Sequence, residues 1–248
     1  MKYLILTLAC SLFTLSSIHA STPNCEKLWD KFNETKTLSA KYKRVMGNCD
    51  REAIMIIGSI AKKASSVSYK DAKKRMFKTL DNRNGRVCSV YSDHCLQTRK
   101  VPNHREMNAE HTWPKSRGAD RKPAISDLHH LFPCNSEVNS IRSSHPFCEV
   151  RDVEWTNGMS SMGTGGGRGK CFEPPHEHKG NVARSMMYFS IRYNKKIDSR
   201  QENFFRKWHK EDPVDQMEID RNNAISRFQR NTNPFIDHPE LVDFIADF

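Results

Sequence analysis

Cysteines in an exported chain constrain this fold more than any other feature of the sequence. Residues 1–20, MKYLILTLACSLFTLSSIHA, combine Lys2, an apolar run and a small-residue end at Ala20, which predicts a secretory signal peptide. Of eight cysteines in the whole chain, loss of Cys10 leaves seven, and an oxidising compartment favours disulfides among them. The seven are Cys25, Cys49, Cys88, Cys95, Cys134, Cys148 and Cys171. An odd number cannot all pair within one chain, and the spacing does not determine which cysteines pair.

The charge of the chain favours a polyanionic partner. The formal net charge is +11 over 248 residues, and removal of Lys2 with the signal leaves +10. Such a balance is typical of proteins that bind nucleic acid or an anionic membrane surface, although a merely soluble basic surface is the alternative. No stretch after residue 20 has the ~18 uninterrupted apolar residues of a spanning helix. We therefore expect a soluble mature protein with no membrane partner.

The first part of the mature chain changes from a helical to a strand-like pattern. Apolar residues recur at helical spacing from Glu26 to Leu80, which predicts a layer of helices. The dipeptide Asn84-Gly85 then marks a tight turn, and the β-rich run 87–91 predicts a strand beside it. Strand and loop continue as far as SEVNSIR, residues 136–142, which we expect to be a short helix.

The second half of the chain predicts two further helices. Between residues 181 and 193 an apolar stripe repeats at four, three and four residues, with Arg184 and Arg192 expected on other faces. Residues 214–228 predict a last helix. Because no internal repeat or linker is visible, we expect one α+β domain over residues 21–248.

The glycine-rich tract NGMSSMGTGGGRGK, residues 157–170, invites a phosphate-loop interpretation. Thr164 stands where the first glycine of that motif belongs, and Cys171 replaces the Ser or Thr that follows its lysine. The tract is therefore expected to be a flexible surface loop.

The stretch NAEHTWPKSRG, residues 108–118, places Glu110 beside His111. Mg²⁺ needs only one or two protein oxygen ligands, which Glu110 and Asn139 could supply, and a neutral imidazole is a suitable general base for an attacking water. Neighbouring side chains on a strand point to opposite faces, so the pair converges only at a kink or at the end of a strand. The dipeptide alone is more often a surface acid beside a structural histidine.

Longer motifs carry a more specific signal. The run NAEHTWPKS is followed by SDLHHLFPCNSEVNSIRSSHPF, then by FEPPHEHKGNVARSMMYFSIRY and finally by NPFIDHPELV. In this order the motifs resemble the secreted endonuclease I family, nucleases of the ββα-metal (His-Me finger) class. The resemblance extends from about VCSVY to the C-terminus.

This resemblance implies a fold, a site and an activity. The fold would be a disulfide-stabilised α+β domain with a ββα-metal (His-Me) finger core flanked by helices. His111 would be the general base, and Glu110 and Asn139 would bind Mg²⁺, with Mn²⁺ or Ca²⁺ as substitutes. The protein would be a secreted or periplasmic, monomeric, sequence-nonspecific endonuclease that cuts double-stranded and single-stranded DNA, and RNA, to 5′-phosphate products.

Supporting residues are less sharply defined. Arg142 and Arg184 are candidates for a phosphate-binding arginine, and either could instead be an ordinary salt-bridge partner. Asp127, His129 and His130 belong to the family pattern, and we expect them to orient the finger through hydrogen bonds rather than to bind the metal.

Two rival interpretations are kept. The first is a basic nucleic-acid-binding or antimicrobial protein without catalysis. The second is a zinc hydrolase that uses His-rich segments such as PPHEHKG, although the spacing of His176 and His178 differs from that of a metalloprotease helix. Since these two histidines depart from the family pattern, we expect them to be surface residues.

Overall fold

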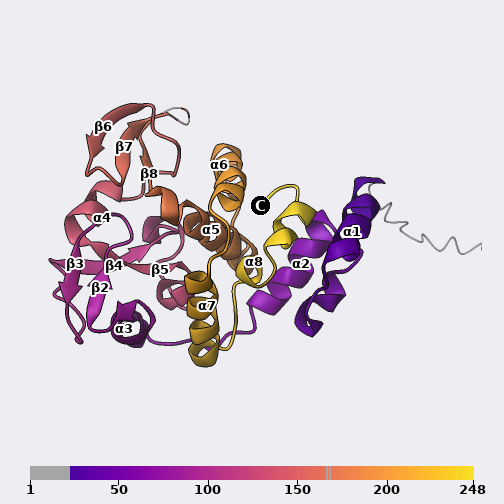
Figure 1. Ribbon diagram of the computed structural model, residues 1–248, viewed down its shortest axis with the longest axis horizontal. Coiled ribbons are helices and arrows are strands. Elements are labelled where there is room, and N and C mark those ends of the chain that lie inside the picture. The colour runs from indigo at the N-terminus through magenta and orange to yellow at the C-terminus, as the bar shows by residue number, and fades with distance from the viewer. Residues whose placement is uncertain (1–22, 166, 168) are drawn as a thin grey trace, which may run out of the picture.

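The computed structural model describes residues 23–165, 167 and 169–248, and it confirms a mixed α+β chain. The expected signal peptide lies outside the described residues. The molecule is elongated, with the N-terminal helices at one end, the small sheets at the other and the long C-terminal helices between them (Figure 1). The α-helices are α1 (Pro23–Thr35), α2 (Asp50–Ala61), α3 (Tyr69–Arg75), α4 (Ser136–Arg142), α5 (Lys179–Tyr193), α6 (Ser199–Glu211), α7 (Gln216–Gln229) and α8 (Pro234–Asp237).

Short helical turns and three antiparallel sheets complete the fold. The turns are η1 (Ala40–Val45), η2 (Met76–Leu80), η3 (Lys115–Arg117), η4 (Ala124–Ser126), η5 (Leu128–His130), η6 (His176–His178) and η7 (Pro239–Phe244). The sheets are β1 (Asn82–Arg83), β2 (Arg86–Cys88) and β3 (Cys95–Gln97); β4 (Met107–His111) and β5 (Leu131–Asn135); and β6 (Asp152–Thr156), β7 (Ser161–Thr164) and β8 (Cys171–Glu173).

Helix α5 lies at the centre of the core. It packs against α2, α6 and α8, and Gly58 of α2 permits the close approach, since a Cβ there would lie 2.9 Å from the carbonyl oxygen of Ile191. Val182, Met186 and Phe189 of the predicted core stripe are buried, and Tyr193 is half-buried. The expectation that the stripe alone forms the core face is wrong, because Arg184 and Arg192, on the other faces of the helix, are buried as well. Both guanidinium groups are buried because each meets a carboxylate supplied by another part of the chain.

Part of the glycine-rich tract is a strand. Residues 161–164 form β7, which pairs with both β6 and β8, so the expectation of a flexible loop is wrong for this part. The physical reason is the size of the residues: a Cβ on Gly163 would lie 2.0 Å from the carbonyl oxygen of Asp152 on β6. Glycine here allows the two backbones to approach, which composition alone does not reveal.

The structure shows which of the seven cysteines pair, because six of them form three disulfides. Their members are Cys25 and Cys49, Cys88 and Cys95, and Cys148 and Cys171. They join α1 to the start of α2, β2 to β3, and the segment after α4 to β8. Among the residues that the structure describes, Cys134 on β5 is the free cysteine, and because its thiol is buried it is not placed to link two chains.

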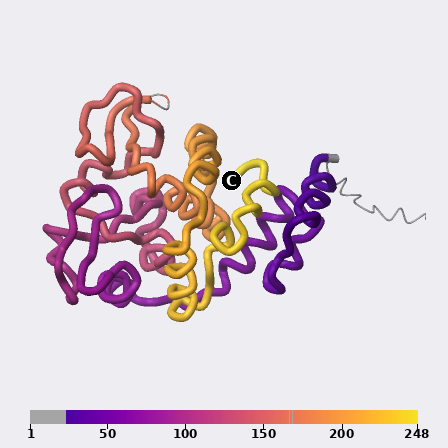
Figure 2. The backbone as a smooth tube through the Cα atoms, in the orientation of Figure 1, coloured from indigo at the N-terminus to yellow at the C-terminus, as the bar shows by residue number. Residues whose placement is uncertain are grey.

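The two ends of the described chain pack together. In Figure 2 the yellow C-terminal segment returns to the indigo N-terminal helices. Trp29 of α1 stacks on Phe244 of η7 with ring centroids 3.9 Å apart, and Phe32 meets the same ring edge-on. This contact makes the N-terminal helices part of the main core.

Within residues 23–165, 167 and 169–248, no helix is both long enough and apolar enough to cross a membrane.

Candidate active site

The predicted site residues lie on a strand-strand-helix unit. Strands β4 and β5 pair antiparallel from Met107 opposite Asn135 to His111 opposite Leu131, and α4 follows β5 directly. The Asn135 side chain caps α4 by accepting hydrogen bonds from the N–H groups of Glu137 and Val138, both at 3.1 Å. The order ββα matches the expectation, while the role of this unit as a metal finger stays a prediction.

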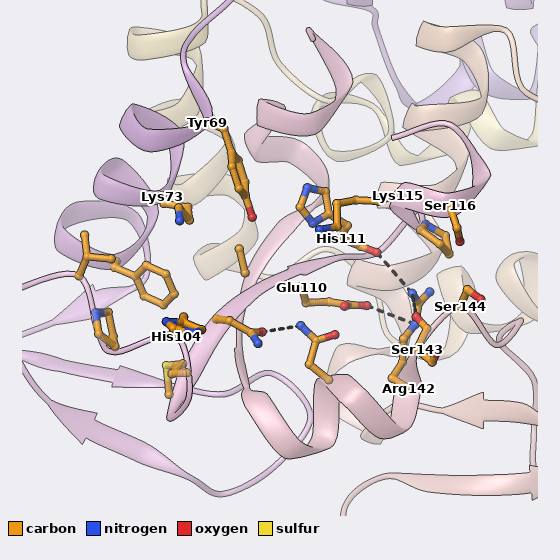
Figure 3. Close-up of a pocket in the computed structure, with 18 residues that line it drawn as sticks. Tyr69, Lys73, His104, Glu110, His111, Lys115, Ser116, Arg142, Ser143 and Ser144 are labelled. Carbon is orange, nitrogen blue, oxygen red and sulfur yellow. Dashed lines mark hydrogen bonds and ion pairs between the residues drawn. The ribbon is translucent and has the colours of Figure 1, made fainter. Parts of the chain in front are cut away.

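A cavity of about 630 Å³ opens beside this unit (Figure 3). Glu110 and His111 from the end of β4, and Asn139 and Arg142 from α4, all line it. Neighbouring side chains on a regular strand point to opposite faces, so Glu110 and His111 were expected to converge only at a kink or at the end of a strand. His111 is the last residue of β4, so the pair does lie where the strand ends. The structure brings the predicted base and both predicted metal ligands to the walls of one cavity.

Glu110 is a buried acid with two side-chain partners. Its Oε1 lies 3.2 Å from Nε of Arg142 and accepts a hydrogen bond from Oη of Tyr91 at 3.1 Å. Burial raises the pKa of the Glu110 carboxyl, and Arg142 opposes that shift. Both side-chain contacts use Oε1, so Oε2 has no side-chain partner among the residues that the structure describes. A carboxylate placed in this way is suited to a cation.

The His111 ring is held in one tautomer. Its Nε2 lies 3.0 Å from the carbonyl oxygen of Ile125, and because a carbonyl can only accept, Nε2 carries the proton. In the neutral ring Nδ1 is then the basic nitrogen. Burial, with a smaller contribution from the neighbouring ring of His130, lowers the pKa of His111 to about 3. The imidazole is thus neutral around pH 7, the state that a general base requires.

Asn139 is oriented by a residue that the sequence did not single out. Its Nδ2 donates to Oδ1 of Asn108 at 2.5 Å, so the carboxamide oxygen of Asn139 is turned away from Asn108. With Glu110 it supplies two oxygen donors at one cavity, and a hard cation such as Mg²⁺ accepts such a set and completes its shell with water. In the described part of the chain no group of three or more His, Cys, Asp or Glu side chains could hold a metal ion.

The two candidate arginines have different surroundings. Arg142 lines the cavity, is only 1% exposed, and donates to the backbone oxygens of His111, Thr112 and Ser143 at 3.4, 2.7 and 3.0 Å. These bonds hold its Nε against Glu110.

Arg184 is not brought to this cavity. Its Nε and Nη2 donate to the two carboxylate oxygens of Glu218 at 2.8 and 2.5 Å, and Nη1 donates to the backbone oxygen of Asp212 at 2.9 Å. A buried guanidinium with this set of acceptors has the salt-bridge role that the sequence allowed as an alternative.

Asp127 is the centre of a buried hydrogen-bond network behind the site. Its Oδ2 accepts from Nη1 of Arg192 at 2.6 Å and from the hydroxyls of Tyr188 and Tyr193 at 3.0 and 2.9 Å, and its Oδ1 accepts from Nε2 of Gln229 at 2.7 Å. Burial alone would raise the pKa of Asp127, but Arg192 and the other donors hold it well below its usual range.

The two histidines after Asp127 are also buried. Nε2 of His129 lies 3.1 Å from the backbone oxygen of Asn231, and Nε2 of His130 lies 2.7 Å from that of Ala124. The rings of His130 and His111 have centroids 5.5 Å apart. Neither histidine lines the cavity, and the role expected for them, orienting the finger through hydrogen bonds, stays a prediction.

Helix α3 contributes residues that sequence reasoning missed. Tyr69 and Lys73 point into the cavity opposite β4 (Figure 3). The Tyr69 ring centroid lies 5.6 Å from that of His111, and Lys73 Nζ lies 4.9 Å from the Tyr69 centroid. In the sequence, Tyr69 and Lys73 belong to a basic amphipathic helix. That pattern does not reveal that the polar face of the helix contacts a site more than thirty residues further along the chain.

The expectation of two surface histidines is half correct. His176 is exposed, but His178 is buried against the rings of Tyr91 and Phe132, with centroids 5.8 and 5.0 Å away. Burial lowers the pKa of His178 to about 3, so it packs as a neutral aromatic residue.

Fold and site together define a class of protein: a disulfide-bonded α+β chain whose ββα unit presents a carboxylate, an amide oxygen and a neutral imidazole to one cavity with basic walls. The family follows from comparison with known sequences. The family model for Endonuclease I matches residues 56–240, and the chain belongs to this family.

Curated relatives are named as nucleases. An extracellular ribonuclease of Bacillus subtilis (strain 168) is 34% identical over an alignment of 163 residues that covers 56% of this chain and 54% of the relative. A periplasmic deoxyribonuclease of Aeromonas hydrophila is 31% identical over 111 residues, 45% of this chain and 47% of the relative. Endonuclease-1 of Buchnera aphidicola subsp. Acyrthosiphon pisum (strain APS) is 31% identical over 111 residues, 45% of this chain and 44% of the relative. The chain thus spans about half the length of the curated relatives that it matches.

Proposed function

We propose that this protein is a metal-dependent, sequence-nonspecific endonuclease that hydrolyses phosphodiester bonds of nucleic acid. One observation carries the proposal: Glu110, His111 and Asn139, separated by up to 29 positions in the chain, line a single cavity whose walls also carry the cations Lys73, Lys115 and Arg142. Membership of the endonuclease I family supports it independently.

His111 is the general base in this proposal. The carbonyl of Ile125 orients the ring and holds the proton on Nε2, while burial keeps the imidazole neutral. Nδ1 would take a proton from the water that attacks phosphorus. The acceptor carbonyl is uncharged, so it fixes the tautomer without making the ring a permanent cation.

Glu110 and Asn139 are the metal ligands in this proposal. Their donor set, one carboxylate and one amide oxygen, fits Mg²⁺, with Mn²⁺ or Ca²⁺ as substitutes. When bound, the ion would supply positive charge to the phosphate oxygens and to the departing 3′-oxygen, which gives 5′-phosphate products. Arg142 would hold the Glu110 carboxylate in place from behind and remains our candidate for contact with the phosphate; Arg184, turned toward Glu218, has no support from the geometry for that role.

The substrates are expected to be double-stranded and single-stranded DNA, and RNA. Relatives include proteins named ribonuclease and deoxyribonuclease. A site that contacts phosphates rather than base edges carries little sequence information, which agrees with nonspecific cleavage. The formal net charge, +11 for the whole chain and +10 without Lys2 of the expected signal peptide, would add electrostatic attraction to the nucleic-acid backbone.

The place of action is expected to be outside the cytoplasm. Three disulfides form readily in an oxidising compartment, and relatives are named extracellular or periplasmic. We propose a secreted or periplasmic protein, working as a monomer without a membrane partner.

The decisive experiment separates this function from binding without catalysis. Plasmid and RNA are digested by the purified protein with and without EDTA, and Mg²⁺ is then restored. We expect cleavage to stop on chelation and to return with the metal. A non-catalytic binding protein would instead leave the plasmid and the RNA uncut, and its binding to them would be the same with and without EDTA.

A substitution tests the general base. His111→Ala should reduce plasmid nicking by at least about 100-fold, the usual contribution of a positioned base, while DNA binding is retained. The metal ligands and the basic surface survive this change. Full nicking by His111→Ala would exclude the proposed mechanism.

A further inference from the structure

A second cavity of about 290 Å³ adjoins the first. Pro114, Arg142 and Ser144 line both, so the two cavities meet along one wall. The short turn η3 forms the ridge between them. Lys115, at its start, faces the first cavity, and Arg117, at its end, faces the second.

Two exposed cations at the second cavity lack carboxylate partners. Arg117 and Lys195 both line it, and neither makes an ion pair with any residue of the described ranges. The Lys195 side chain lies against the backbone next to Arg117, because a Cβ on Gly118, the residue after Arg117, would lie 3.1 Å from Cε of Lys195. The neighbouring Lys196 differs, since its Nζ binds Asp247 at 2.9 Å.

The ridge that carries Arg117 is anchored to the core. Trp113 donates from Nε1 to the backbone oxygen of Arg117 at 3.0 Å, and its ring stacks on Phe189 of α5 with centroids 4.7 Å apart. Asp198 is the acid on the cavity wall, and its Oδ1 accepts from the backbone N–H of Arg200 as the cap of α6. The backbone that carries Arg117 is therefore fixed to the core, and the pocket has a net positive charge.

We propose that the second cavity binds the phosphate of a nucleotide next to the one that is cleaved, through Arg117 and Lys195. The inference rests on the proposed function, because it takes the first cavity as the place of the scissile phosphate. A polynucleotide strand lying across the shared wall would bring neighbouring phosphates to the two cavities in turn. A substrate with a single phosphodiester would fill only the first.

The test compares Arg117→Ala/Lys195→Ala with a matched control. The control is Lys27→Ala/Lys31→Ala, which removes two exposed cations from α1 at the far end of the molecule (Figure 1). Both pairs are placed in the His111→Ala background, and binding of a labelled single-stranded oligonucleotide is followed by fluorescence anisotropy as salt is raised.

Each phosphate contact on a single strand contributes about 0.7 to the slope of log affinity against log salt concentration, so loss of two should reduce the slope by about 1.4. Between about 50 and 200 mM salt, the loss of affinity would then be about sevenfold smaller than in the control. An unchanged slope, equal to that of the control, would overturn the proposal.

Cleavage supplies a second readout. With His111 present, the ratio of kcat/KM for an oligonucleotide to that for a dinucleoside monophosphate should fall several-fold in Arg117→Ala/Lys195→Ala. Equal losses on both substrates would place these cations at the scissile phosphate and would also overturn the proposal. If the unaltered protein cleaves neither substrate, the proposed function fails, while the anisotropy slopes still decide whether the second cavity binds phosphate.

Discussion

Asp127 gives the sharpest test of how the site is supported. Asp127→Asn keeps the volume of the side chain but removes its charge, so the buried guanidinium of Arg192, 2.6 Å away, loses its counter-ion. The new amide also presents an NH₂ group to an environment of donors, among them Tyr188 and Gln229. No cavity is created, so the cost comes from electrostatics and lost hydrogen bonds.

The magnitude follows from the burial of the pair. The side chains of Asp127 and Arg192 are 0% and 5% exposed, and removing one partner of such a pair costs about 3–5 kcal/mol of unfolding free energy. For a chain of this size, each kcal/mol lowers Tm by about 2–4 °C, so we expect a fall of about 6–20 °C.

Urea-induced unfolding, followed by tryptophan fluorescence, measures this loss. Asp120→Asn is the matched control, because its carboxylate is 57% exposed and 3.7 Å from Arg121, and we expect less than about 0.5 kcal/mol there. Arg192→Met combined with Asp127→Asn should recover part of the stability, since it removes the unpaired charge. A loss below about 1 kcal/mol in Asp127→Asn alone would refute the assignment of Asp127 as the centre of the network.

Three further predictions concern the metal ligand, pH and the free thiol. Asn108→Ala should raise the Mg²⁺ concentration for half-maximal cleavage about 10–100-fold, because the Asn139 amide loses its anchor, while Asn33→Ala on α1 should leave it unchanged. Burial lowers the pKa of His129 to about 4 from 6.5, so between these values the unfolded chain binds more protons and the free energy of unfolding falls as pH falls. His129 contributes at most about 1.4 kcal/mol per pH unit to the slope of the unfolding free energy against pH. The midpoints of urea unfolding at pH 7 and pH 5 should therefore differ less in His129→Gln than in the unaltered protein. Cys134 should react with a thiol reagent only after unfolding; immediate reaction of the native protein would contradict its burial.

Local elements were largely predictable from the sequence because their signals are local. The helix at α5, the short helix α4 and the hairpin turn at Asn84 and Gly85 all follow from periodicity or turn chemistry within a few residues. Helix α6 was missed although its apolar residues are regularly spaced. Strand β7 was missed because glycine-rich composition is the usual mark of a loop, and its pairing depends on partners elsewhere in the chain.

Burial of polar residues was the main failure of sequence reasoning. Arg192 and His178 have no local signal of burial, since polar side chains on a helix or turn are exposed in most proteins. The first is buried because Asp127 reaches it from 65 positions away, and the second because aromatic rings enclose it. Partners at such separation are decided only when the chain has folded.

The sequence by itself determined the chemical types available, the family resemblance and the order of the elements, because residue identity, motif and periodicity can be read along the chain. Glu110, His111 and Asn139 were identifiable in this way. Only the tertiary structure decided that they share one cavity, that Tyr69 and Lys73 form its opposite wall, and that a second basic pocket adjoins it. The physical reason is that a site is a set of distances between residues remote in sequence, and these are set by the packing of helices and strands.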